Sequence, residues 1–93
     1  MTIHLKVVTP LRLLAETDAD VVYLPTLEGE IGVLPGHRPL YTAIGRGVLS
    51  FRADGDEERF AIKGGFAEIR PDEVVVVTEM GEDESSRRSE DRG

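Results

Sequence analysis

One short stretch of the chain, EGEIGVLPGHRPL from Glu28 to Leu40, holds residue types that catalysis and metal binding commonly use. His37 is the kind of side chain that most often acts as a general base near neutral pH. Glu28 and Glu30 flank one glycine, so in an extended strand their carboxylates would point to the same side, about 6.5 Å apart. The stretch could therefore serve acid–base catalysis, bind a metal through Glu28, Glu30 and His37, or contact a partner.

The rest of the sequence favours partner contact over catalysis. The chain has no Cys, and its serine and threonine residues lie in no nucleophile-elbow pattern. Three Phe, two Tyr and no Trp are too few to line the aromatic cleft that a sugar-cleaving enzyme needs. The glycines match neither the dinucleotide-binding pattern nor the P-loop, because no helix follows them. We therefore predict no catalytic, cofactor-binding or metal-ligating residues, and a protein that is not an enzyme.

The composition indicates one small domain. A chain of 93 residues, 40% of them hydrophobic, can form a modest core of Val, Leu and Ile. Eighteen Asp and Glu against eleven Lys and Arg give a net charge of -7, which would repel a phosphate backbone, so nucleic acid is not expected as a partner. No run approaches the roughly 18 apolar residues of a membrane span, and no signal sequence is evident. We expect a soluble, cytoplasmic chain with no direct membrane insertion.

The elements that must position the stretch are predicted to be strands. Ile3, Leu5 and Val7 alternate with polar residues, which indicates a half-buried strand. Residues 21–24 form a β-branched apolar run that Pro25 is expected to end, because proline cannot donate to a strand ladder. A further strand over residues 11–16 is less clearly marked.

The second half of the chain predicts a hairpin and two further strands. Residues 48–52 and 60–62 flank Asp54-Gly55, a pair that favours a tight turn. Gly64-Gly65 interrupts the apolar pattern before residues 66–69, which predicts a bulge or bend. After a turn at residues 70–73, the run Val74–Val77 is short and apolar enough for a strand buried on both faces. Strands punctuated by Gly or Pro about every ten residues predict an all-β sandwich or barrel.

The end of the chain has a different composition. After Met80 the sequence GEDESSRRSEDRG is charged and contains no apolar residue. Such a segment cannot bury surface. We predict a folded domain over residues 1–79 and a disordered, charged tail over residues 80–93.

Taken in order and spacing, several motifs closely resemble the epsilon subunit of F-type ATP synthase. The motifs are Leu24-Pro25, EGEIGVLPGH from Glu28 to His37 with Pro39-Leu40, Gly47-Val48-Leu49, and Gly64-Gly65-Phe66. The resemblance runs from Ile3 to about Glu79. It implies a flattened antiparallel β-sandwich of about ten strands at the foot of the central stalk, which agrees with the all-β prediction made from the residues.

The resemblance also implies partners and a role. The family's subunit joins the gamma subunit to the ring of c subunits and so couples proton or sodium translocation to ATP synthesis. By resemblance, Glu28, Gly29 and Glu30 would face the c ring, while His37, Arg38, Leu40 and Tyr41 would face gamma. The implied location is the cytoplasmic face of the cell membrane, as a peripheral part of the synthase. Candidate apolar anchors for an interface are Leu40, Tyr41 and Ile44, although burial in the core competes with that role.

Two features depart from the family. Full-length members usually continue into a C-terminal helical hairpin that can restrain ATP hydrolysis, but no amphipathic pattern follows Glu79, so a short form is expected and the hairpin's roles are not carried over. Arg38 stands where a small residue often follows the histidine. Two alternatives remain open. One is a free-standing β-sandwich adaptor or small-ligand-binding module with an apolar pocket between its sheets, and the other is a small hydrolase that uses His37 with Glu28 or Glu30.

Overall fold

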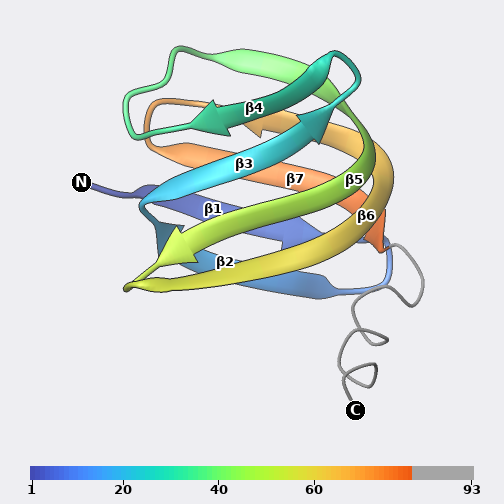
Figure 1. The fold of residues 1–93 in the computed structure, drawn as a ribbon, viewed down its shortest axis with the longest axis horizontal. Coiled ribbons are helices and arrows are strands. Elements are labelled where there is room, and N and C mark those ends of the chain that lie inside the picture. Colours follow the sequence, from blue (N-terminus) through green and yellow to red (C-terminus); the bar gives the residue numbers. More distant parts are fainter. Residues whose placement is uncertain (81–93) are drawn as a thin grey trace.

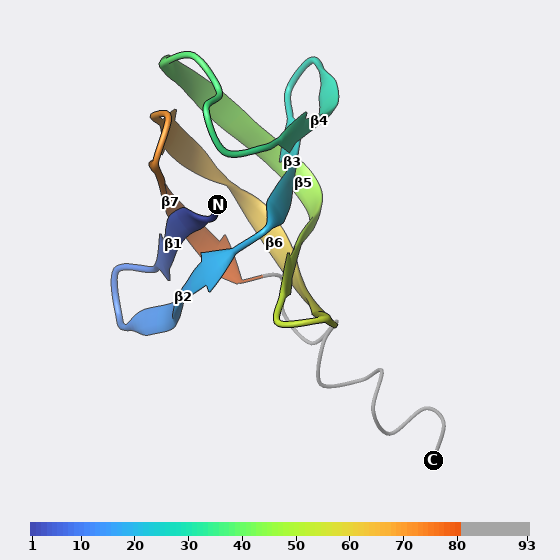
Figure 2. The ribbon, with the colours of Figure 1, turned by 90° about the vertical axis from the view of Figure 1, so that its left-hand side faces the viewer.

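The computed structural model describes residues 1–80 as a single rolled sheet of seven strands (Figure 1). The strands are β1 (Ile3–Val8), β2 (Leu13–Ala19), β3 (Val21–Thr26), β4 (Gly29–Val33), β5 (Leu40–Ala53), β6 (Asp56–Ile69) and β7 (Glu73–Met80). Their order in the sheet is β2-β1-β7-β6-β5-β3-β4. Figure 2 shows how the sheet folds over on itself to make two facing layers. The predicted all-β sandwich is confirmed, and the predicted tail, Met80 apart, lies outside the described residues.

The prediction of about ten strands is wrong in number, because two strands serve both layers. β5 and β6 are each 14 residues long and curve from one layer into the other. The segments 60–62 and 66–69, expected as separate strands, are therefore two parts of β6. The bend between them falls at Gly64 and Gly65, which have φ angles of 115° and 131°, and the register with β7 shifts there. The β1–β7 pair is parallel, while the other strand pairs are antiparallel.

The predicted hairpin between β5 and β6 is confirmed, and its turn contains the predicted Asp54-Gly55 pair. Ala53 pairs with Asp56, which leaves Asp54 and Gly55 as a two-residue connection. Their φ angles are 52° and 82°, and a tight hairpin turn of this kind requires positive φ at both central residues. Asp tolerates this conformation better than most residues, and Gly adopts it without strain.

Pro25 does not end its strand as predicted, since β3 continues to Thr26. Pro25 lies opposite Glu30 of β4, whereas on the β5 side the register is interrupted between Tyr23 and Thr26. The missing N–H of the proline therefore falls at an irregularity, where it removes no regular ladder bond. The extra length of β3 lets the β3–β4 hairpin carry its turn to the rim of the molecule (Figure 2).

The space between the layers is filled by apolar side chains. The strand predicted from Ile3, Leu5 and Val7 is confirmed, because all three side chains are fully buried. The strand Val74–Val77 is buried on one face only, since Val77 is 45% exposed. Among the residues whose burial the structure describes, fifteen apolar residues are at most 4% exposed: Ile3, Leu5, Val7, Ala19, Val22, Leu24, Val33, Ile44, Leu49, Phe51, Ile62, Ala67, Ile69, Val74 and Val76. Residues 1–80 contain no helix with the length and hydropathy of a membrane crossing.

Candidate interaction surfaces

The β3–β4 hairpin ends in a turn that its own side chains hold in place. Thr26 pairs with Gly29, so Leu27 and Glu28 form the turn. The Thr26 hydroxyl donates to the Gly29 carbonyl at 2.6 Å and accepts from the Glu28 amide at 3.2 Å. Gly29 has a φ of 117°, a conformation that a side chain would strain. The turn is therefore fixed by sequence-specific contacts.

This hairpin presents two carboxylates and one leucine to solvent. Glu28, Gly29 and Glu30 are all exposed, as an interface role requires. Glu28 lies in the turn and not in a strand, so the extended geometry that would align it with Glu30 is not present. Leu27 is 72% exposed at the tip of the hairpin, and sequence reasoning missed it. An apolar residue in a two-residue turn is the signal that could have identified it.

The β4–β5 loop orients His37 through backbone groups. The His37 amide donates to the Leu34 carbonyl at 3.1 Å, and the Gly36 amide donates to the Pro71 carbonyl at 2.8 Å. The half-buried imidazole has its Nδ1 atom 2.7 Å from the Arg38 carbonyl oxygen. Because a carbonyl only accepts, Nδ1 is the protonated nitrogen in this contact. The ring is therefore held against its own loop.

The structure does not bring Glu28, Glu30 and His37 together. The hairpin turn precedes β4 and the His37 loop follows it, so the four steps from Gly29 to Val33 separate them by about 13 Å. Within residues 1–80, no group of three or more His, Asp or Glu side chains is arranged to hold a metal ion. The two ends of β4 instead define two separate surfaces.

The start of β5 exposes the predicted anchors, with one correction. Arg38 is exposed, Leu40 is 41% exposed and Tyr41 is 68% exposed. Ile44 is only 3% exposed and belongs to the core, so its prediction as an interface anchor is wrong. The Tyr41 ring stacks on Phe66, with centroids 5.8 Å apart and an interplanar angle of 8°. Phe66 is itself 50% exposed.

Phe66 belongs to a line of apolar side chains that crosses five strands on the outer face of the sheet. The register pairs Ala43 with Phe66, Phe66 with Val77, Val77 with Val8 and Val8 with Leu13. We call these five residues the apolar row. None of them is fully buried, and Leu13 is 49% exposed. Sequence reasoning identified Gly64-Gly65-Phe66 as a bend and as a motif of the family resemblance, but it did not predict the apolar row, because the strand pairing that assembles the row is not visible in the sequence.

A shallow hollow adjoins the Tyr41 end of this face. It measures about 250 Å³ and is lined by Pro39, Leu40, Tyr41, Glu68, Ile69 and Arg70. The Nε atom of Arg70 donates to Glu68 at 3.1 Å, and this contact raises the pKa of Arg70 above its ordinary value. The rim therefore carries a fixed ion pair beside an apolar patch, an arrangement common in protein interfaces.

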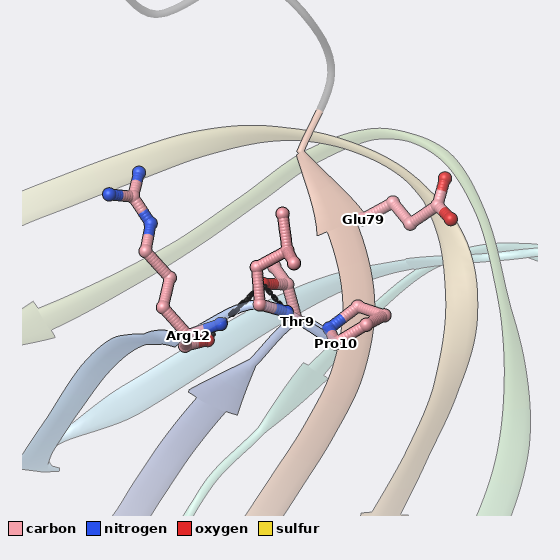
Figure 3. Close-up of a pocket in the computed structure, with 5 residues that line it drawn as sticks. Thr9, Pro10, Arg12 and Glu79 are labelled. Atoms are coloured by element: carbon pink, nitrogen blue, oxygen red, sulfur yellow. Dashed lines mark hydrogen bonds between the residues drawn. The ribbon is translucent and has the colours of Figure 1, made fainter.

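A larger hollow of about 560 Å³ lies at the β1–β2 turn (Figure 3). Thr9, Pro10, Leu11, Arg12 and Glu79 line it. The Thr9 hydroxyl accepts from the amides of Leu11 and Arg12 at 3.2 and 3.1 Å, so it stabilises the turn. None of the residues predicted for a site lines this hollow.

Comparison with known proteins identifies relatives of this sandwich. A family model described as the β-sandwich domain of the ATP synthase delta/epsilon chain matches residues 2–84. The ATP synthase epsilon chain of Carboxydothermus hydrogenoformans is 44% identical over 80 residues, which cover 86% of this chain and 60% of the relative. That of Prochlorococcus marinus strain MIT 9515 is 49% identical over 82 residues, covering 88% and 61%. The chain thus spans about 60% of the length of the curated relatives that it matches.

Solved structures share the fold at lower identity. A chain in the mitochondrial ATP synthase of Euglena gracilis (OSCP/F1/c-ring) superposes with a TM-score of 0.80 at 24% identity, covering 97% of this chain and 61% of that one. A chain in the central stalk/c-ring structure of Tetrahymena thermophila ATP synthase gives a TM-score of 0.69 at 15% identity, covering 85% and 64%. At these identities the likeness concerns the fold.

Proposed function

The chain belongs to the family of the ATP synthase delta/epsilon chain β-sandwich domain, and on that premise we propose that it is an epsilon-type rotor subunit joining gamma to the c ring. In this role it has no active site of its own. It sits at the cytoplasmic face of the cell membrane as a peripheral part of the synthase and couples ion translocation to ATP synthesis. The curated relatives named above are ATP synthase epsilon chains, which supports the proposal.

The observation that carries the gamma contact is the exposed stack of Tyr41 on Phe66. Two aromatic rings that lie ordered on a sheet and remain 68% and 50% exposed leave apolar area in water. Aromatic side chains are enriched at the centres of protein interfaces, where they supply large contact area. In this proposal Leu40, Tyr41 and Phe66 are the apolar centre of the gamma-facing surface, and His37 and Arg38 belong to its rim.

The hairpin turn at the other end of β4 supplies the second contact. Glu28 and Glu30 are exposed and form no ion pair within residues 1–80. Free carboxylates on a protruding turn can accept hydrogen bonds from basic or amide groups of a partner surface. We therefore assign Glu28, Gly29 and Glu30 to the c-ring-facing surface, with Leu27 as a new apolar member.

A rigid body between the two surfaces suits a subunit that transmits torque. The His37 loop and the hairpin turn lie at the two ends of β4, whose last residue, Val33, packs in the apolar core, and the long strands β5 and β6 cross both layers. A force applied at one end of β4 therefore moves the other end. The sandwich acts as a spacer that fixes the distance between its partners.

Reversing the charge of the hairpin should weaken the c-ring contact selectively. In the variant Glu28→Lys with Glu30→Lys, we expect the affinity of the chain–gamma complex for detergent-solubilised c rings to fall roughly ten-fold at low salt. The reversed charges would no longer attract the basic or amide groups proposed on the c ring. Binding to isolated gamma should stay unchanged. Affinity is measured by surface plasmon resonance on immobilised c rings.

A matched control has the same net charge but alters the opposite end of the molecule. Glu57→Lys with Glu58→Lys changes two exposed carboxylates on β6 beside the β5–β6 turn. This variant should bind c rings as the native chain does. Equal losses in both variants would show that overall charge, and not the hairpin, governs the contact.

A further inference from the structure

His4 contacts two carboxylates of the neighbouring strand. Its Nε2 atom lies 2.9 Å from Glu16, and its Nδ1 atom lies 3.2 Å from Asp18. Asp18 is the direct register partner of His4 on β2, and Glu16 is two residues further along the same face. An ionised carboxylate can only accept, so both contacts are hydrogen bonds only when both ring nitrogens carry protons. The geometry is that of an imidazolium.

The two carboxylates lie on a strand with a neighbour on one side only. β2 is the first strand in the sheet order and pairs with β1 alone. Its ends are tied by backbone bonds, from the Thr9 amide to the Arg12 carbonyl and from the Asp20 amide to the Arg52 carbonyl, each 2.8 Å long. Between these ties, β2 is held by its ladder to β1, by the packing of Leu14, Ala15 and Ala19 on the core, and by the contacts of His4.

The groups that face His4 from the other packed strands are also charged. Glu73 of β7 is the register partner of His4 on its other side, and Lys6 is the next residue of β1 on the same face. The hydrogen bond to Glu16, followed by that to Asp18, raises the pKa of His4 above its ordinary value of 6.5. Two carboxylates therefore contact the ring, while one further carboxylate and one ammonium group lie at neighbouring positions of the sheet.

From this arrangement we propose that His4, Glu16 and Asp18 form a pH-sensitive clamp, the His4 clamp, that fastens the edge strand β2 to β1 when His4 is protonated and releases it when the proton is lost. A neutral imidazole has one nitrogen with a lone pair, and that nitrogen would face a carboxylate oxygen. One contact then becomes repulsive. The clamp stands on its own geometry and does not rest on the proposed rotor function.

The direction of the pH effect follows from the raised pKa. Because the folded state holds the His4 proton more tightly than the unfolded chain, the clamp's contribution is complete below about pH 6.5 and is lost as the pH rises through the higher folded-state pKa.

Release of the His4 clamp would also loosen β2 where it forms one wall of a hollow. Glu16 also lines a hollow of about 370 Å³ between β2 and the β5–β6 hairpin, together with Phe51 and Phe60. These two rings have centroids 6.3 Å apart, and Phe51 is part of the core. Transient opening of β2, expected to be a few-fold more frequent at alkaline pH, would expose both an unpaired strand edge and apolar core surface.

The clamp is tested on the full chain by nuclear magnetic resonance. The first readout is the titration of the His4 ring protons, and the second is the amide-exchange protection factor of β2 residues at pH 6 and pH 8.5. Between pH 6 and pH 8.5, we expect the protection factors of β2 amides to fall two- to five-fold more than those of the other edge strand, β4. The expected difference is small because exposed cross-strand ion pairs contribute little stability. In His4→Gln this excess pH dependence should disappear.

A second variant keeps the histidine and removes its partners. In Glu16→Gln with Asp18→Asn the titration midpoint of His4 should fall, and β2 protection should no longer depend on pH beyond that of β4. An unchanged midpoint, or the same excess pH dependence of β2 in the native chain and in His4→Gln, would overturn the proposal. If His4→Gln does not fold, Asp18→Asn alone should show a partial loss of the excess.

Discussion

Gly65→Ala is expected to destabilise the fold by about 3 kcal/mol or more, the largest stability effect that we predict for a single methyl group. A Cβ atom at this position would lie 1.9 Å from the Val77 carbonyl oxygen and 2.9 Å from the Thr78 Cα atom. Both are backbone atoms, so neither can rotate away. The φ of 131° adds strain for any residue with a side chain.

The expected loss is a substantial part of the stability of a small domain, which is roughly 5 to 15 kcal/mol. Urea unfolding followed by far-ultraviolet circular dichroism measures the change. Gly55→Ala is the matched control, because Gly55 also has positive φ (82°) but no atom within 4 Å of its Cβ position. The control should lose about 1 kcal/mol. Equal losses at both positions would contradict the close approach of β6 and β7.

Replacing the aromatic stack should cause the largest loss of partner binding. In Tyr41→Ala with Phe66→Ala we expect affinity for the gamma subunit to fall at least thirty-fold, since truncated aromatic anchors at an interface centre typically cost 2 kcal/mol or more. Both side chains are at least half exposed, so folding stability should change by only about 1 kcal/mol. Isothermal titration calorimetry measures the affinity.

Tyr23→Ala provides the control for this double variant. Tyr23 is a tyrosine on β3 that is 37% exposed and lies against Gly32, away from the apolar row. Its truncation should leave gamma affinity unchanged. Retained affinity in the Tyr41 and Phe66 double variant would contradict the gamma-facing surface as assigned here, even if the chain binds gamma elsewhere.

Much of the fold could be predicted because its signals are local. The alternation of Ile3, Leu5 and Val7 identified a strand with one buried face, and Asp54-Gly55 identified the hairpin turn, in which both residues have a positive φ in the structure. Strand number could not be predicted in the same way. A pair of glycines marks a bend, but only the tertiary pairing with β7 shows that one strand continues through Gly64 and Gly65.

The candidate surfaces were predictable in part. The resemblance singled out the hairpin turn and the His37 loop, and both are exposed or half-buried in the structure. The sequence did not reveal Phe66 or Val77 as surface residues, because apolar side chains on either face of a strand read alike. Ile44 failed as an anchor for the same reason, since the outward or inward direction of a residue depends on register and curvature. The assignment of each surface to a partner stays a prediction.

Binding of this chain to a purified gamma subunit from the same source tests the central claim most directly. We predict that the two co-elute as a one-to-one complex, that the double variant of Tyr41 and Phe66 abolishes the complex at micromolar concentrations, and that the double variant of Glu28 and Glu30 retains it. His37→Ala should weaken the complex to a smaller extent, because it loosens the loop that precedes the stack. Absence of a complex between native chains at micromolar concentrations would contradict the rotor role.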